Sequence, residues 1–159
     1  MKLLLSLLLL QSLILTNDLI TFDQKRAFSY LEVQCSFGPR VPGSKAHIQG
    51  KDHIVNTIQS SADSVIEQSF MHSFVYTGEL IKLTNIVAQF NPEMDNRIWI
   101  AAHWDSRPWA DLDKDISKRN IPILGANDGA SGVAVLLEIA NQLKVKSPKI
   151  GVDLIFIDG

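Results

Sequence analysis

The chain has 159 residues, of which 46% are hydrophobic and 20% are charged, a balance typical of a globular protein and not of a disordered one. Its formal net charge is −2 and no stretch is polybasic, so we expect no nucleic-acid partner, because such a partner requires a positive surface. The single cysteine, Cys35, excludes an internal disulfide. We expect Cys35 to be a small buried residue in a fold that packing stabilises.

The N-terminus departs from this composition. A positively charged start is followed by residues 3–15, which are apolar apart from three polar positions. A helix of this length spans about 20 Å, short of the ~30 Å hydrocarbon core of a membrane. We therefore expect no stable membrane span and interpret residues 1–17 as a signal peptide, which makes the protein an exported one, periplasmic or secreted. The alternative is a buried N-terminal helix.

Hydrophobic periodicity predicts two helices and three strands in the first two thirds of the chain. The helices run from Asp23, near the N-cap, to Cys35, and from the cap residue Ser44 to about Ser61. A proline- and glycine-rich loop over residues 37–44 separates them. The strands cover residues 64–73, 83–90 and 97–102, and the continuous apolar character of the last one predicts burial on both faces. Residues 91–96 between the last two strands predict a hairpin connection.

The last third of the chain predicts a crossover unit. A polar loop over residues 104–122 leads to a helix over 130–144 with an apolar stripe, and then to a buried strand over 151–158. This order implies an α/β sheet with helices on its faces. The chemistry of such sheets lies beyond the carboxyl ends of the strands, and the sequence stops at Gly159, directly after a strand. We therefore expect a longer protein.

Three residues in this crossover unit are candidates for a metal site. His103 and Asp105 follow one predicted strand, and Asp128 precedes the helix in a glycine-containing loop. Zinc prefers imidazole nitrogen and carboxylate oxygen, which makes His103 and Asp128 candidate ligands, and a neighbouring acid such as Asp105 commonly orients a ligand histidine. A surface histidine beside solvated acids is the alternative. The loop lacks the spacing of phosphate-binding loops, and Asp128 would repel a phosphate.

Five other residues have open roles. His47 and His53 are six residues apart, which is not the spacing that lets two histidines share a metal on one helix face, so we expect solvated or capping residues. Trp104 and Trp109 flank the candidate site and either line a substrate pocket or cover a sheet edge. Arg107 between them can pair with a neighbouring acid or contact the substrate.

Several ordered segments carry a resemblance to a known family. The segments AAHWDSRPWAD (101–111), PILGANDGASGVAVLLEIA (122–140) and GVDLIFIDG (151–159) resemble the M28-type zinc aminopeptidase/glutaminyl cyclase superfamily. FGPRVPGS (37–44) and LTNIVAQFNP (83–92) resemble its glutaminyl-peptide cyclotransferase branch, in the bacterial form. The resemblance implies a three-layer α/β sandwich with a mixed, mostly parallel central sheet and helices on both faces, incomplete at the C-terminus. Residues 18–159 would then be the N-terminal part of an M28-type zinc-enzyme domain.

The resemblance also implies Zn²⁺ as the cofactor. Asp128 matches the metal-ligand aspartate of the family. His103 matches the histidine that holds the second metal in the aminopeptidases and that the one-zinc cyclases retain, and Asp105 matches the acid beside it. The family's general-base glutamate would follow Gly159, so the resemblance assigns no catalytic base within this sequence. The 159-residue chain alone is therefore expected to be inactive.

The function implied by the resemblance is conversion of the N-terminal glutamine of peptides or proteins to pyroglutamate with release of ammonia, by a monomer. The cysteine pair of the animal cyclases is replaced by Ala102 and Val133, which points away from the animal branch and leaves the chemistry unchanged. Two alternatives stay open. One is a metallo-aminopeptidase in which His103 and Asp128 both hold zinc, and the other is a non-catalytic binding module on the same fold.

Overall fold

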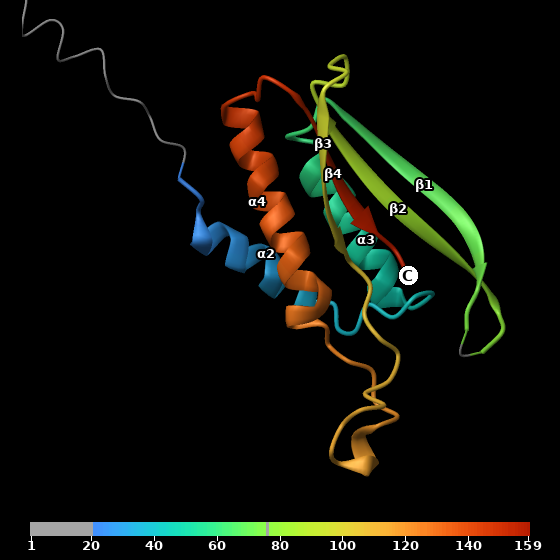
Figure 1. Cartoon of the computed structure of the whole chain (residues 1–159). Coiled ribbons are helices and arrows are strands. Elements are labelled where there is room, and N and C mark those ends of the chain that lie inside the picture. Colours follow the sequence, from blue (N-terminus) through green and yellow to red (C-terminus); the bar gives the residue numbers. More distant parts are fainter. Residues whose placement is uncertain (1–20, 76) are drawn as a thin grey trace, which may run out of the picture.

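The computed structural model describes residues 21–75 and 77–159, so the predicted signal peptide over residues 1–17 lies outside the described residues. The described part is a four-stranded mixed sheet with three helices (Figure 1). The strands are β1 (Ser64–Ser73), β2 (Leu80–Phe90), β3 (Arg97–His103) and β4 (Gly151–Ile157). The helices are α2 (Gln24–Ser36), α3 (Lys45–Ile58) and α4 (Ser131–Val145), and two short helical turns are η1 (Ile116–Lys118) and η2 (Ala126–Ala130).

The helices begin where the predicted caps place them. The side chain of Asp23 accepts hydrogen bonds from two backbone N–H groups in the first turn of α2, each at 3.0 Å. Ser44 Oγ accepts from His47 N at 3.1 Å at the start of α3. These side chains satisfy backbone donors that a helix leaves unpaired at its first turn. Among the described residues, no helix has the length and apolar character that a membrane span needs.

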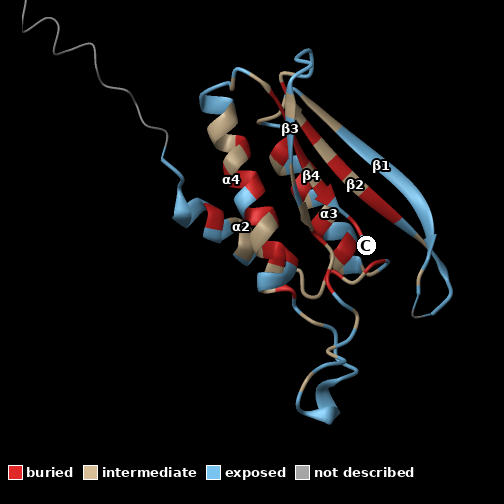
Figure 2. Ribbon diagram, viewed as in Figure 1, coloured by how far each residue is buried: buried red, intermediate tan, exposed pale blue. Residues whose placement is uncertain are grey.

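One hydrophobic core joins the sheet to the helices. Its buried residues come from α3, α4, β2 and β4, as the red segments of these elements in Figure 2 show, and from Trp104 directly after β3. On the strands they alternate, with Ile86, Ala88 and Phe90 on β2 and Val152, Leu154 and Phe156 on β4, so they share one sheet face. Helices α3 and α4 therefore cover that face, and α2 packs against α4. The predicted helices on the second face are not found among residues 21–75 and 77–159.

The sheet corrects one part of the predicted fold. The α/β class and the mixed sheet are confirmed, but only the pairing of β3 with β4 is parallel, whereas β1 with β2 and β2 with β4 are antiparallel. "Mostly parallel" is therefore wrong for the described strands. The cause is local connectivity: a short turn joins β1 to β2 as an antiparallel hairpin, and only the β3–α4–β4 crossover yields a parallel pair.

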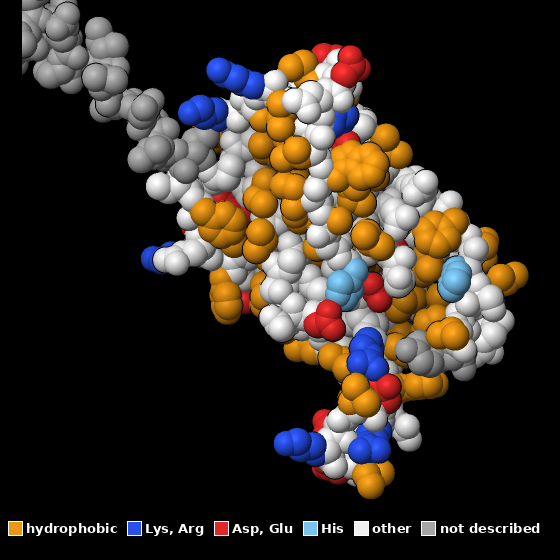
Figure 3. Space-filling model, in the orientation of Figure 1, with side chains coloured by type: hydrophobic (Ala, Val, Ile, Leu, Met, Phe, Trp, Pro, Cys, Tyr) orange, Lys and Arg blue, Asp and Glu red, His pale blue; other side chains and the backbone are white. Residues whose placement is uncertain are grey.

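The strand order, β1-β2-β4-β3, corrects two further predictions. The connection over residues 91–96 is not a hairpin, because β4 lies between the two strands that it joins, and Asn91 Nδ2 donates to Pro148 O beside the start of β4 at 2.7 Å. β3 is an edge strand of the described sheet and is not buried on both faces, with Trp99 75% exposed. Exposed hydrophobic side chains also lie over α4 and the strands beside it (Figure 3).

Candidate metal centre

The candidate residues gather at one edge of the sheet. β3 and β4 run parallel, and His103 at the end of β3 is aligned with Ile157 at the end of β4. Trp104 N donates to Ile157 O at 3.0 Å and continues the pairing by one residue. The turn η2, which contains Asp128, reaches the same edge from the start of α4. The topology therefore brings residues that are 25 positions apart to one place.

His103 contacts both other predicted site residues, Asp105 and Asp128, directly. His103 Nε2 lies 2.7 Å from Asp128 Oδ1, and His103 Nδ1 lies 3.1 Å from Asp105 Oδ1. The side chain of Asp105 is 15% exposed, whereas those of His103 and Asp128 are 42% and 72% exposed. The imidazole thus contacts the largely buried Asp105 through Nδ1 and the exposed Asp128 through Nε2. This is the arrangement in which a second acid orients a ligand histidine.

Glycines allow η2, which carries Asp128, to lie close to the end of β3, which carries His103. A Cβ at Gly129 would lie 2.2 Å from His103 O and 2.8 Å from His103 Cε1, so a side chain there would collide with β3. Gly125, which precedes η2, has φ of 69°, a left-handed conformation that glycine adopts readily. Asp128 itself is extended (φ −117°, ψ 93°) at the kink before α4, and its peptide bond to Gly129 is cis. The absence of a side chain at Gly129 therefore lets η2 lie directly against the end of β3.

The two acids change the protonation of the histidine. Partial burial lowers the pKa of His103, but the hydrogen bonds and the charges of Asp128 and Asp105 outweigh it, so the pKa is raised above its ordinary value. Without a metal, the pair of carboxylates stabilises an imidazolium. A cation bound between the two side chains would replace that proton, because a metal requires the neutral imidazole.

The donor atoms suit zinc in kind. An imidazole nitrogen and a carboxylate oxygen face each other at the surface, and both are ordinary zinc ligands. In the described part of the chain, no group of three or more histidine, cysteine or acidic residues is arranged to hold a metal ion. His103 and Asp128 therefore fit part of a zinc site.

The two histidines of α3, His47 and His53, lie in different surroundings. His47 is not solvated, because it is buried, its Nε2 lies 2.7 Å from Asp158 Oδ1, and its ring stacks on Trp104 at 4.3 Å. Its Nδ1 accepts from Gly43 N at 3.4 Å directly before α3, which agrees with the predicted capping role. Asp158 in turn accepts from Thr84 N at 2.6 Å. His53 is half-buried against Phe37, and burial lowers its pKa. The periodicity of α3 could have placed His47 on the buried side, but its partner follows it by 111 residues.

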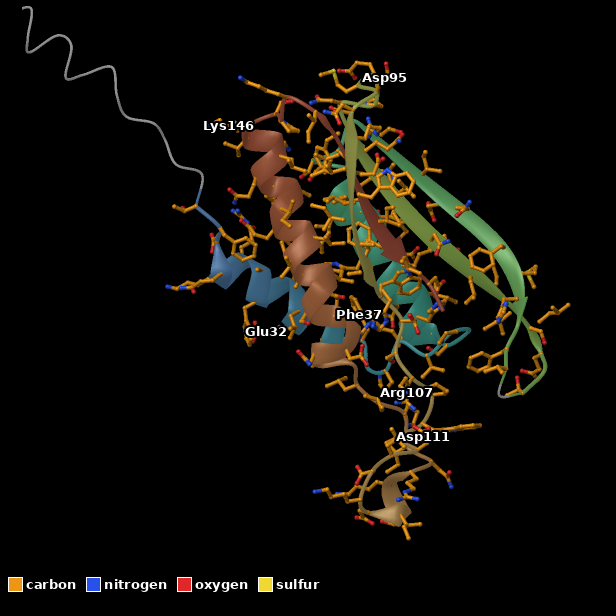
Figure 4. All side chains as sticks on the ribbon, viewed as in Figure 1. Glu32, Phe37, Asp95, Arg107, Asp111 and Lys146 are labelled. Atoms are coloured by element: carbon orange, nitrogen blue, oxygen red, sulfur yellow. The ribbon has the colours of Figure 1, made fainter. Side chains whose placement is uncertain are left out.

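The long loop after β3 projects away from the sheet (Figure 1). Arg107 pairs with Asp111 at its start, where both residues are labelled in Figure 4. Trp104 is completely buried and donates from Nε1 to Thr84 O, so it covers the sheet edge and cannot line an open pocket. Trp109 is 39% exposed.

A cavity of about 280 Å³ lies beside the candidate metal centre. Asp105 and Ser106 form one wall, and the β1–β2 hairpin, including His72 and Ile81, forms another. Ser106 is buried, and its hydroxyl has no hydrogen-bond partner among the described residues. The cavity therefore lies next to the acid that holds His103.

Arg40 is the buried residue that the sequence reasoning missed, because it lies in a segment predicted only as a loop. Its side chain is completely buried and donates hydrogen bonds to backbone carbonyls on both sides of the long loop. The available signal was an arginine flanked by two prolines, Pro39 and Pro42, in FGPRVPGS.

Comparisons with known proteins find relatives in sequence and in structure. Residues 85–159 match the family model described as Peptidase family M28. The chain is similar to a Tannerella forsythia glutaminyl cyclase (44% identity, TM-score 0.82) and to a Zn-dependent exopeptidase from Parabacteroides distasonis (41% identity, TM-score 0.83), in each case over 86% of this chain and 47% of the other. The Drosophila melanogaster glutaminyl-peptide cyclotransferase is 29% identical over 126 residues, which are 76% of this chain and 33% of that protein.

These matches confirm the predicted resemblance to the M28-type zinc aminopeptidase/glutaminyl cyclase superfamily. The chain spans about half the length of the solved structures and about a third of the length of the curated relatives that it matches.

Proposed function

We propose that the protein containing this chain is a zinc-dependent glutaminyl-peptide cyclotransferase. The observation that carries the proposal is the 44% identity to the Tannerella forsythia glutaminyl cyclase over 86% of this chain. The reaction would join the α-amine nitrogen of an N-terminal glutamine to its own side-chain amide carbon, and the amide nitrogen would leave as ammonia. Because the nucleophile belongs to the substrate, the main task of the enzyme is to orient and polarise one molecule.

The residues of this chain have distinct roles in the proposal. Asp128 contributes a carboxylate ligand, and a bound zinc would supply a Lewis acid that polarises the amide carbonyl. Asp105 holds His103 Nδ1 and thereby aims Nε2 at Asp128, which keeps that carboxylate in one orientation. The general base that removes the proton from the α-amine is not assigned to any residue described here.

The substrate and location belong to the same proposal. The partners would be N-termini of peptides or proteins, bound by a monomer. The apolar segment over residues 3–15 supports an exported protein, periplasmic or secreted.

One observation favours a second function. His103 Nε2 and Asp128 Oδ1 face each other at the surface, 2.7 Å apart, and both are the residue types that hold zinc in the M28-type aminopeptidases. The similarity to a Zn-dependent exopeptidase at 41% identity supports the same alternative. In that case the protein would hydrolyse the first peptide bond of varied peptides.

The experiment that separates the two functions uses the full protein, loaded with Zn²⁺. It is incubated with paired peptides that differ only in an N-terminal glutamine or leucine, and the products are identified by mass spectrometry together with an ammonia assay. We expect the glutamine peptide to lose one ammonia and the leucine peptide to remain intact. Free N-terminal amino acids from both peptides would replace the cyclase proposal with the aminopeptidase, and no product from either would support a binding module.

A further inference from the structure

The side chain of Arg40 is completely buried, and its partners are backbone carbonyl oxygens. Nε donates to Trp104 O at 3.0 Å, and Nη2 donates to Gly125 O at 2.9 Å. Nη1 is shared among three further carbonyls, those of Gln34, Gly38 and Leu124, at 3.2 to 3.4 Å. The backbone of Arg40 takes part as well, since its carbonyl accepts from Ser106 N at 3.1 Å.

These partners lie at the two ends of the long loop. Trp104 and Ser106 belong to the strand end where the loop leaves the sheet, and Leu124 and Gly125 belong to the segment where it returns. The outgoing end carries His103 and Asp105, and the returning end leads directly into Asp128. A single side chain therefore ties together the two backbone segments that carry the candidate metal centre.

Arginine suits this task for chemical reasons. The guanidinium presents five N–H donors in one plane, whereas a lysine ammonium is a point charge with three donors on a flexible stem. Burial lowers the pKa of Arg40, and the charge of Asp105 acts in the opposite direction. A buried cation is costly unless it is fully hydrogen-bonded, so the five carbonyl partners explain how the charge is accommodated.

The surroundings leave little room for another arrangement. A Cβ at Gly125 would lie 3.0 Å from Arg40 Nη2, and a Cβ at Gly50 on α3 would lie 3.0 Å from Arg40 Cδ. Glycines thus allow the guanidinium to lie between α3 and the returning loop.

We propose that Arg40 is a positioning residue of the metal centre, which sets the distance between His103 and Asp128 by clamping both ends of the long loop. It touches neither side chain through any hydrogen bond described here and acts through the backbone of Trp104 and Gly125. The inference rests on the proposed metal centre, and it holds whether the reaction is cyclisation or hydrolysis.

The test compares Arg40→Lys with Arg97→Lys in the full protein. Arg97 is the matched control, because it is also largely buried and its Nη1 donates to the carbonyl of Asn91 at 2.7 Å. It lies at the opposite end of β3, six residues or about 20 Å from His103 along the strand. Co²⁺ serves as the metal probe, since its absorption spectrum reports the ligand geometry. Hydrogen exchange of peptides over residues 104–106 and 124–130 reports the two loop ends, and kcat and KM are measured separately.

We expect Arg40→Lys to bind Co²⁺ about 10- to 100-fold more weakly, as is usual when a residue that supports metal ligands is lost. Its spectrum should change, both loop ends should exchange faster together, and kcat should fall more than KM changes. Arg97→Lys should lose thermal stability and keep its Co²⁺ affinity and spectrum.

Unchanged Co²⁺ affinity and spectrum in folded Arg40→Lys would overturn the inference. So would a failure of Arg40→Lys to fold where Arg97→Lys folds, since Arg40 would then be needed for folding itself. A wild-type protein that binds Co²⁺ tightly and forms no pyroglutamate would refute the proposed function alone. A wild-type protein that binds no Co²⁺ would refute both.

Discussion

Gly129 offers a direct test of the close approach between η2 and β3. In Gly129→Ala, the new methyl group would lie 2.2 Å from His103 O and 2.8 to 2.9 Å from two atoms of the His103 ring. The nearest neighbour is a backbone oxygen within the sheet, so the segment that carries Asp128 has to move and the strand does not.

The size of that movement follows from the contact distance. To reach an ordinary van der Waals separation from His103 O, the segment must shift by about 1 Å. Forcing a methyl group into a packed interface costs about 1–3 kcal/mol of unfolding free energy. A misplacement of about 1 Å in a catalytic site lowers turnover by on the order of 100-fold. We therefore expect a moderate loss of stability together with a large loss of activity.

The assay measures both quantities on the full protein. Chemical denaturation gives the unfolding free energy, and ammonia release from a glutamine-initiated peptide gives kcat/KM. Gly132→Ala is the control, because it also adds a methyl group between α4 and β3, but its nearest neighbour is Ala102 Cβ at 2.9 Å and not a site residue.

The two variants should lose similar stability, and Gly129→Ala should lose far more activity. Wild-type turnover in a Gly129→Ala protein with an intact near-ultraviolet spectrum would refute the reasoning, because η2 and β3 would then not need their close contact. Equal losses of activity in both variants would show that packing of α4, and not the position of Asp128, limits the enzyme.

Three further predictions concern the ligands, the pH dependence and the chain itself. Asp128→Asn should abolish turnover. His103→Ala should lower kcat/KM by about 10- to 100-fold if His103 only orients Asp128 beside one zinc, and should abolish turnover if His103 holds a second zinc. Elemental analysis of the bound zinc accompanies the kinetics. The pKa of Glu138 is lowered, because hydrogen bonds from Arg26, the backbone N–H of Asp23 and Gln142 outweigh its desolvation. A lowered pKa contributes stability that is present above the unfolded-state value of about 4.3 and is lost as the pH falls through the folded-state value. Glu138→Gln should therefore flatten the acid limb of the plot of unfolding free energy against pH. An unchanged acid limb would contradict this. The 159-residue chain alone should bind zinc weakly in calorimetry and release no ammonia, and measurable turnover would contradict the ligand assignment.

Helix α4 and the caps were predictable because their causes are local. The predicted apolar stripe of α4 repeats at helical spacing: Val133, Leu136, Leu137 and Ala140 on it are buried, and Leu143 is partly buried. The caps Asp23 and Ser44 bond to backbone groups within three residues. Such features depend on neighbours along the chain, which a sequence displays directly.

The strand order was not predictable in the same way. β4 is the last strand in the chain, yet it lies between β2 and β3. Nothing in the short segment over residues 91–96 shows that the strands on either side of it will be separated by a third strand. Pairing depends on which apolar faces share a core after the crossover, and that is a property of the whole sheet.

The candidate site likewise contains residues that local sequence reveals and residues that depend on distant parts of the chain. His103, Asp105 and Asp128 were identifiable from their residue types and from their places next to a strand end and a helix start, and the structure brings them together. Arg40 and His47 were only partly identifiable: the motif and the helix periodicity gave a signal for each, but their bonds to Trp104 and Asp158 span 64 and 111 residues of the chain. The burial of a charged residue becomes visible only when the segments that bury it are in place.

Beneath the candidate metal centre, the end of the sheet contains buried polar and charged groups, which an ordinary apolar core lacks. Arg40, His47 and Asp158 are all buried there, and each makes a hydrogen bond to a segment from a distant part of the chain. Apolar residues of similar size often stabilise a fold as well as a buried charged pair does, so stability alone does not require this network. What hydrogen bonds to backbone groups add is direction, since each one holds one segment at a defined distance and angle. The edge of the sheet therefore combines a rigid polar network beneath the surface with the exposed pair His103 and Asp128 above it, which is the arrangement that a metal centre with an open position needs.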